Sequence, residues 1–315
     1  GWFSENTIQN KINKCKKTKN KNKLLVFGDS FVEYYLNDDN NLTKLFEDKS
    51  ENVFCNFGLS GSNIPSYFNR LDHVLKSNIA NTKGILIFLY EGNDFSEFLV
   101  KDNSSYVLER KYNIFKKIFA KSYFLNFLYR EIYKPFFKIN SINKKNLLYK
   151  NFIQYNEANF NKRFKEINKN DLKLFSQGKL NRSWLSIGLT KPDYFLNIYE
   201  KDSLNLQLKE INPYLKTIEK IKEEYNIPVH VFIIPHVYYI SEKAKKNWSK
   251  VFKFNNYKIS GPIEISKYLE EKYDYIFYIN ELLYEDFIPL DGHLFPSGNE
   301  KIVNFALKKI KDSYL

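Results

Sequence analysis

Residues 24–33, LLVFGDSFVE, constrain the fold of this chain more than any other segment. The four apolar residues stand between a lysine-rich segment and the turn formers Gly28, Asp29 and Ser30. A short apolar run that ends at a glycine is typical of a buried parallel strand. Gly28 permits the tight backbone that would expose Ser30 just beyond the strand. Ser30 would then lie at the C-terminal end of a strand, where open α/β sheets bind their ligands.

Four more apolar runs have the length of strands, and helical patterns separate them. The pattern at 64–75 places apolar residues on one helix face, and the pattern at 297–310 does the same near the end of the chain. Strands that alternate with helices predict a parallel sheet with helices on both faces. We therefore expect an α/β fold, a flavodoxin-like three-layer α/β/α sandwich with about five parallel strands. The four runs are residues 53–56, 85–90, 229–234 and 276–279.

The length of the chain allows one large α/β domain with insertions or two small domains. We expect residues 24–315 to form one large domain, after a basic leader at residues 1–23 that we interpret as a solvated linker. The region at about 96–226 has no clear strand pattern, and we interpret it as a helical insertion. Within it, residues 112–137 carry aromatic side chains among lysines. Packing onto the main domain and an amphipathic helix on a membrane surface both explain that stretch.

The composition excludes some classes of protein. Hydrophobic residues make up 43% of the chain and aromatic residues 17%, which is enough for a core and excludes global disorder. The formal charge of +13 invites a nucleic-acid partner. However, the lysines occur with asparagines throughout the chain, and no nucleic-acid motif accompanies them. We therefore expect no nucleic-acid partner.

The two cysteines are Cys15, in a polar basic segment, and Cys55, in an apolar run. A disulfide and two free thiols both fit this pattern, and we favour two free thiols. Two lone cysteines make no metal motif. We expect no metal site and no cofactor.

Polar loops follow three of the predicted strands, and a fourth precedes the last helix. Because the carboxyl ends of parallel strands meet at one edge of a sheet, we expect these loops to lie together. They supply a hydroxyl, a glycine N–H, an asparagine amide and an Asp/His pair. Acyl transfer needs such groups, namely a nucleophile, a base, a group that orients the base, and donors for the oxyanion. The loops are residues 28–30, 56–61, 92–94 and 291–293.

In this order, the four blocks resemble those of the GDSL/SGNH hydrolase family. The resemblance implies that Ser30 is the nucleophile, His293 the general base and Asp291 the residue that orients His293. It also implies an oxyanion hole made by the backbone N–H groups of Ser30 and Gly58 and the side-chain amide of Asn93. The resemblance covers roughly residues 24–95 and 228–314.

The match departs from the family pattern in two blocks. One residue usually separates glycine from asparagine in the third block, whereas Gly92 precedes Asn93 directly here. Two residues usually separate aspartate from histidine in the last block, whereas Gly292 alone does so here. If Asp291 does not reach the histidine ring, the site works as a Ser–His dyad, or another carboxylate such as Asp286 serves.

The resemblance implies a serine-dependent acyl-ester hydrolase or O-acyltransferase that acts on an acylated glycan or a small acyl ester. The YEGND form of the third block and the basic leader are similar to the membrane-tethered bacterial branch that modifies polysaccharides. O-acetyl groups of a cell-surface polysaccharide are therefore the expected substrate. A lipase or thioesterase for longer acyl chains and a catalytically inactive glycan-binding protein are the alternatives. Three further residues would lie beside the site, where they either contact a substrate or are exposed to solvent: His236, for which we favour solvent exposure, and Glu33 and Glu91.

The sequence begins at Gly1 and contains no methionine. We therefore expect a segment to precede Gly1, either a signal peptide or a membrane anchor. No run reaches the ~18 apolar residues that span a bilayer. The expected location is extracytoplasmic, in the periplasm or at the cell surface, with a membrane tether before Gly1.

Overall fold

The computed structural model of the chain describes residues 5–18, 21–33, 41–92, 94–95, 203–252, 263–288 and 292–314. The chain divides into two compact units, one of Gly1–Lys101 with Ile167–Leu315 and the other of Asp102–Glu166. All described residues belong to the first unit.

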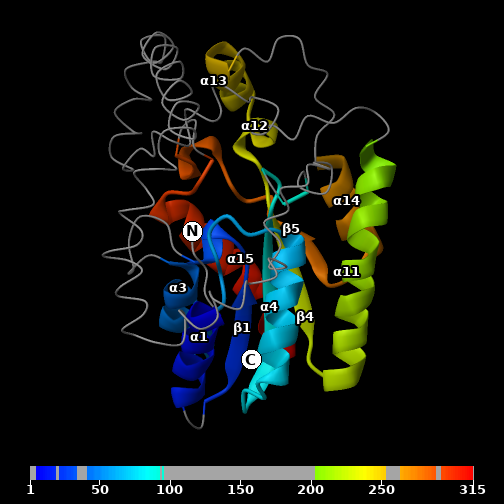
Figure 1. The fold of residues 1–315 in the computed structure, drawn as a ribbon. Coiled ribbons are helices and arrows are strands. Elements are labelled where there is room, and N and C mark those ends of the chain that lie inside the picture. Colours follow the sequence, from blue (N-terminus) through cyan, green and yellow to red (C-terminus); the bar gives the residue numbers. More distant parts are fainter. Residues whose placement is uncertain are drawn as a thin grey trace, which may run out of the picture. The chain divides into compact units, whose positions relative to one another are not determined.

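A parallel sheet of five strands forms the centre of the first unit, in the order β2-β1-β3-β4-β5 (Figure 1). The order reverses at β1, which has β2 on one side and β3 on the other. In doubly wound sheets such a reversal marks the crevice where ligands bind. The predicted parallel α/β sheet is confirmed. Its strands are β1 (Lys23–Phe27), β2 (Val53–Asn56), β3 (Thr82–Tyr90), β4 (Val229–Ile234) and β5 (Ile276–Tyr278).

Helices cover both faces of the sheet and complete an α/β sandwich. Against the first face, α1 (Glu5–Lys17), α4 (Ile64–Lys76), α11 (Ser203–Tyr225) and α14 (Ile263–Lys272) share one buried cluster with the strands. Against the second face lie α3 (Leu42–Lys49) and α15 (Pro296–Tyr314), which contact each other. Figure 1 shows α4 in front of the strands and α15 behind them. The further described elements are α2 (Ser30–Glu33), α12 (Val237–Ile240), α13 (Glu242–Phe252) and the 3-10 helix η4 (Tyr284–Asp286).

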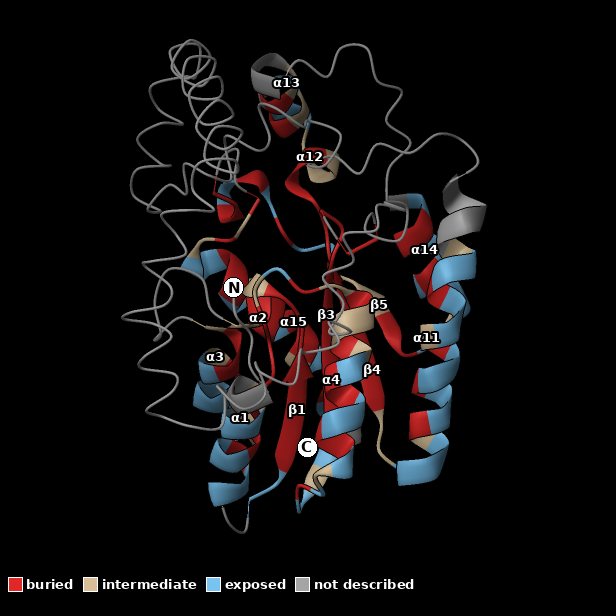
Figure 2. Ribbon diagram, viewed as in Figure 1, coloured by how far each residue is buried: buried red, intermediate tan, exposed pale blue. Residues whose placement is uncertain are grey.

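The second face of the sheet is packed with aromatic rings. Phe46 of α3 stacks on Phe54 of β2 with 4.7 Å between ring centroids. Phe88 of β3 stacks on Phe232 of β4 at 5.2 Å, and Phe305 of α15 meets Phe232 edge to face at 6.4 Å. Each such ring buries about 150–250 Å², so a few phenylalanines fill this layer. Figure 2 shows the buried strands in red and the exposed outer sides of the helices in pale blue.

The segment before β1 is part of the domain rather than a solvated linker. Helix α1 buries Ile12 and Cys15, which lie three residues apart on one helix face. A disulfide joins Cys15 to Cys55 of β2, with 5.5 Å between their Cα atoms. The expectation of two free thiols is therefore wrong. The polar neighbours of Cys15 in sequence project from the other side of the helix, so they say nothing about the face that carries the thiol.

Helix α11 falls within the region predicted as an insertion, but it belongs to the core of the first unit. Its residues Ile211, Leu215, Ile218 and Ile221 recur at helical spacing and are buried against the first face of the sheet. The rest of the predicted insertion, residues 96–202, lies outside the described residues, and so does the aromatic stretch at 112–137. No helix of the described part of the chain is both long enough and apolar enough to cross a membrane.

Candidate active site

Ser30 begins the short helix α2, three residues after β1 ends. The carboxylate of Asp29 accepts a hydrogen bond from the Phe31 N–H at 3.0 Å, and the Asp29 carbonyl accepts from the Glu33 N–H at 2.9 Å. These bonds turn the chain sharply from strand to helix. A side chain at Gly28 would meet Val32 Cγ2 at 2.5 Å, so this close approach requires glycine. Asp29 thus shapes the turn, and Ser30 is presented at its end.

His293 is held at the end of a short hairpin that precedes α15. Phe287 and Leu294 form an antiparallel bridge, and the Ile288 N–H donates to the His293 carbonyl at 2.7 Å. Gly292 has φ +88°, a conformation that other residues rarely adopt. An added Cβ at Gly292 would also lie 2.5 Å from the Tyr90 hydroxyl. The glycine between Asp291 and His293 is therefore required twice, by its φ and by its contact with Tyr90.

The structure brings Ser30 and His293 together. The Ser30 Oγ lies 2.8 Å from Nε2 of His293. The Phe31 ring stacks on the His293 ring at 4.9 Å and meets the Tyr90 ring at 4.5 Å, which supports the imidazole from one side. Ser30 and His293 are partly exposed. With its proton on Nδ1, His293 presents the Nε2 lone pair to the hydroxyl, as a general base must.

Asp291, the residue predicted to orient His293, lies outside the described residues. The alternative carboxylate, Asp286, is engaged elsewhere. It is buried, and its Oδ2 accepts from the Leu283 N–H at 2.8 Å and from the Lys301 ammonium at 2.7 Å. Asp286 therefore anchors η4 to α15 rather than orienting the imidazole.

The predicted oxyanion donors differ in whether their N–H groups already have a hydrogen-bond acceptor. The Ser30 N–H has no acceptor among the described residues. The Gly58 N–H instead donates to the Asn56 side-chain oxygen at 2.9 Å. Asn93 lies outside the described residues. In the same loop as Gly58, Gly61 is exposed with φ +71°, and its N–H has no acceptor in the described part of the chain.

Glu33 positions the loop after β2. Its Oε2 accepts from the Ser60 N–H at 2.7 Å, and its Oε1 lies 4.0 Å from the Lys11 ammonium. Lys11 of α1 also donates to the Gly58 carbonyl at 2.5 Å. A side chain at Gly58 would lie 2.4 Å from the Glu33 backbone nitrogen, so the loop packs directly on α2. The Glu33 carboxylate, which was predicted to lie beside the site, thus bonds to groups of the protein itself.

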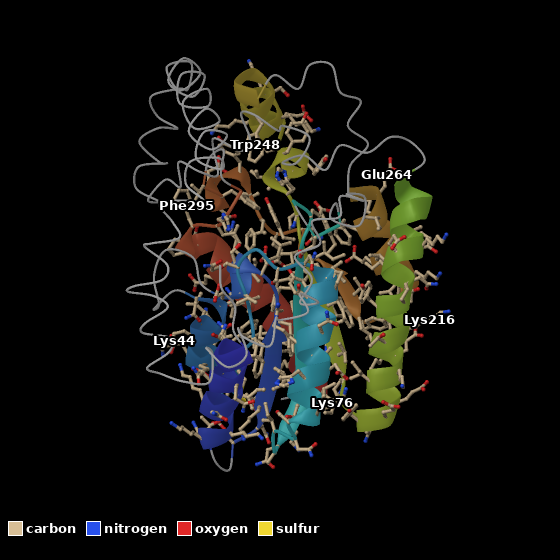
Figure 3. All side chains as sticks on the ribbon, in the orientation of Figure 1. Lys44, Lys76, Lys216, Trp248, Glu264 and Phe295 are labelled. Atoms are coloured by element: carbon tan, nitrogen blue, oxygen red, sulfur yellow. A yellow bond between two sulfur atoms is a disulfide. The ribbon has the colours of Figure 1, made fainter. Side chains whose placement is uncertain are left out.

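Glu91 and His236 are buried, which argues against contact with a dissolved substrate. The Glu91 carboxylate is fully buried and accepts from the His236 N–H at 2.9 Å and the Ser266 hydroxyl at 2.6 Å. Burial raises the pKa of Glu91 to about 7. Burial lowers the pKa of His236 to about 3, and its ring packs on Trp248 of α13, which Figure 3 labels. The pair joins the ends of β3 and β4 to α14.

Arg70 is the residue near the site that the sequence patterns do not reveal. It lies on α4 beside the apolar face and is buried. Its guanidinium Nη2 donates to the Gly28 carbonyl at 3.0 Å and to Ser62 Oγ at 3.1 Å. Nearby, both carboxylate oxygens of Asp94 accept from the Tyr67 hydroxyl, at 2.8 and 2.9 Å. The only available signal was an arginine at the edge of an otherwise apolar helix stripe.

Among the described residues, no group of three or more His, Cys, Asp or Glu side chains could hold a metal ion. Comparison of the chain with protein-family models, curated proteins and solved structures finds no match. The geometry of the site is therefore the basis on which we infer a function.

Proposed function

We propose that this protein is a serine-dependent acyl-ester hydrolase or O-acyltransferase of the SGNH type. The hydrogen-bond distance between Ser30 Oγ and His293 Nε2 carries this proposal. Ser30 lies just beyond the carboxyl end of β1, and His293 lies in the hairpin before the last helix. The order of the strands around β1 adds support, because doubly wound sheets bind ligands at this edge.

In the proposed reaction, Ser30 Oγ attacks the carbonyl carbon of the ester while His293 Nε2 takes the hydroxyl proton. The negative oxygen of the tetrahedral intermediate accepts a hydrogen bond from the Ser30 N–H. His293 then gives its proton to the leaving alcohol, and the acyl group stays on Ser30. Water or a sugar hydroxyl next attacks this acyl-enzyme, with His293 again as the base.

We assign the second backbone donor to Gly61 rather than to Gly58. The Gly58 N–H already donates a hydrogen bond to the Asn56 side-chain oxygen, whereas the Gly61 N–H has no acceptor among the described residues. A preorganised donor must be available for the oxyanion, because a hydrogen bond that must first break contributes less to its stabilisation. The side-chain amide of Asn93 remains the predicted third donor.

The proposed substrate is an O-acetylated polysaccharide outside the cytoplasm. The disulfide between Cys15 and Cys55 supports the location, since disulfides persist mainly in oxidising compartments. The alternative of an inactive glycan-binding protein requires no contact between a hydroxyl and an imidazole. The distance between Ser30 and His293 therefore favours an enzyme.

Turnover of p-nitrophenyl acetate by the parent and by Ser30→Ala tests the proposal, with mass spectrometry to detect an acyl group on Ser30. Ser77→Ala is a matched control, because its hydroxyl caps the far end of α4. We expect turnover and an acyl adduct in the parent and in Ser77→Ala, and neither in Ser30→Ala. Turnover in Ser30→Ala equal to that of the parent would overturn the assignment of Ser30 as the nucleophile.

A second measurement separates hydrolase from transferase. An acetylated polysaccharide donor is incubated with the protein, with and without a soluble oligosaccharide acceptor. Free acetate alone defines a hydrolase, whereas acetylated acceptor defines a transferase. Release of neither product, combined with glycan binding that persists in Ser30→Ala, would support the binding protein.

A further inference from the structure

Arg70 contacts two loops with a single nitrogen. Nη2 lies 3.0 Å from the Gly28 carbonyl and 3.1 Å from Ser62 Oγ. Gly28 begins the turn that presents Ser30. Ser62 closes the turn that contains Gly61, with its own N–H on the Leu59 carbonyl at 3.1 Å. The guanidinium therefore lies at the junction of the nucleophile turn and the loop that carries the proposed backbone donor.

Other bonds converge on the same junction. The Gly28 carbonyl also accepts from the Leu59 N–H at 3.0 Å, so the two loops are bonded directly as well as through Arg70. The Ser62 hydroxyl donates to the Leu59 carbonyl. Each loop therefore has a defined position relative to the other, and both Arg70 and the Ser62 hydroxyl, 3.4 Å from the Gly28 carbonyl, bond across the junction.

The charge of Arg70 is balanced by buried groups. Asp29 and Asp94 both attract it, and its guanidinium carbon lies 5.2 Å from the centroid of the Tyr67 ring. Burial lowers the pKa of Arg70 to about 10, so the side chain stays charged at neutral pH. Its Nε has no hydrogen-bond partner in the described part of the chain. A buried guanidinium is costly even when paired, and an apolar residue of similar volume would often stabilise the fold equally well.

We infer that Arg70 is a positioning residue that sets the distance between the Ser30 nucleophile turn and the backbone donor of the following loop. This inference rests on the proposed function. A loss of Arg70 lets the two loops shift relative to each other. The effect therefore falls on kcat rather than on KM, because only the transition state needs both the nucleophile and the donor in register.

The test compares Arg70→Met, Arg70→Lys and a control, Lys23→Met. Lys23 is also a buried cation, but it lies at the other end of β1, where its ammonium donates to the Ala80 carbonyl at 3.0 Å. We expect Arg70→Met to lower kcat about 100-fold with little change in KM. Arg70→Lys should lose less, because its ammonium can still donate to one of the two loops. Lys23→Met should lose stability without losing kcat.

A double variant tests whether Arg70 acts through Ser62. If Arg70 aligns the loops by this contact, Arg70→Met combined with Ser62→Ala should be no slower than Arg70→Met alone. A kcat for Arg70→Met equal to that of the parent would overturn the inference. So would a loss in Lys23→Met as large as that in Arg70→Met, since this would show a general effect of destabilisation.

Two readouts separate the failure of this inference from the failure of the proposed function. Labelling of Ser30 by a fluorophosphonate reports whether the serine is activated in the parent, and no labelling there would count against the proposed function. Amide hydrogen exchange reports the junction itself, whatever the activity. We expect the Leu59 and Ser62 amides to exchange faster in Arg70→Met and not in Lys23→Met. Unchanged exchange in Arg70→Met would overturn the positioning role.

Discussion

The hydroxyl oxygen of Ser30 lies 2.8 Å from Nε2 of His293, although 263 positions separate the two residues in the chain. Ser30 follows the first strand, and His293 precedes the last helix. Such a contact forms only in the folded domain, because the two segments are distant in the sequence.

Replacing His293 by alanine should abolish most of the esterase activity that we propose. The hydroxyl of Ser30 would lose the base that accepts its proton, so we expect turnover of p-nitrophenyl acetate to fall by roughly 10³-fold or more. Added imidazole should restore part of the rate in His293→Ala and should not do so in Ser30→Ala. Unaltered turnover in His293→Ala would exclude the histidine as the base.

Loss of the disulfide should destabilise the domain. Cys15 and Cys55 are the only cysteines of the chain, so a reductant breaks this bond and no other. The bond closes a loop with a sequence separation of 40. Chain entropy for a loop of this length corresponds to about 4 kcal/mol of stability. Urea unfolding with and without a reductant measures this difference. The Cys15→Ser/Cys55→Ser double variant is the control, and its midpoint should match that of the reduced parent and ignore the reductant.

Gly292→Ala should lower both stability and turnover. The alanine would have to adopt φ +88°, which costs about 1–3 kcal/mol, and its Cβ would approach the Tyr90 hydroxyl at 2.5 Å. Tyr90→Phe removes that hydroxyl, so the double variant should recover the steric part of the loss and keep the part due to φ. Thermal unfolding and p-nitrophenyl acetate turnover would be measured for all four proteins. Wild-type behaviour of Gly292→Ala would show that the hairpin relaxes freely.

The buried carboxylate of Glu91 should make stability depend on pH. Burial raises its pKa from 4.5 to about 7, so the folded protein holds this proton more tightly than the unfolded chain. Between these two pKa values the contribution of Glu91 to stability falls as pH rises. Gln cannot ionise. The free energy of unfolding of Glu91→Gln minus that of the parent should therefore increase by roughly 2–3 kcal/mol from pH 5 to pH 8.

Urea titrations at several pH values would measure that difference, in which the other ionisable groups cancel. Glu224→Gln is the control, because Glu224 is an exposed residue of α11 paired with Lys220. Its difference from the parent should stay nearly flat across the same range. A flat difference for Glu91→Gln as well would contradict a raised pKa in the folded protein.

The local patterns of the sequence sufficed for the strands and for the turn that presents Ser30. Each strand is a short apolar run, and a buried parallel strand needs little more than that to be recognised. The alternation of strands with helices predicted a parallel sheet, which the strand order confirms. The proximity of Ser30 to His293 was also expected, because the loops that carry them were predicted to lie together at one edge of the sheet.

Contacts between segments distant in sequence were decided only by the tertiary structure. The thiol of Cys15 meets that of Cys55 because α1 packs beside β2, and no pattern around either residue encodes that docking. Glu91 and His236 are buried rather than exposed, since α13 and α14 cover them. Arg70 reaches Gly28 and Ser62 only once α4 lies against the sheet. Sequence patterns record which face of an element is apolar, whereas the partner of each polar group depends on how the elements pack.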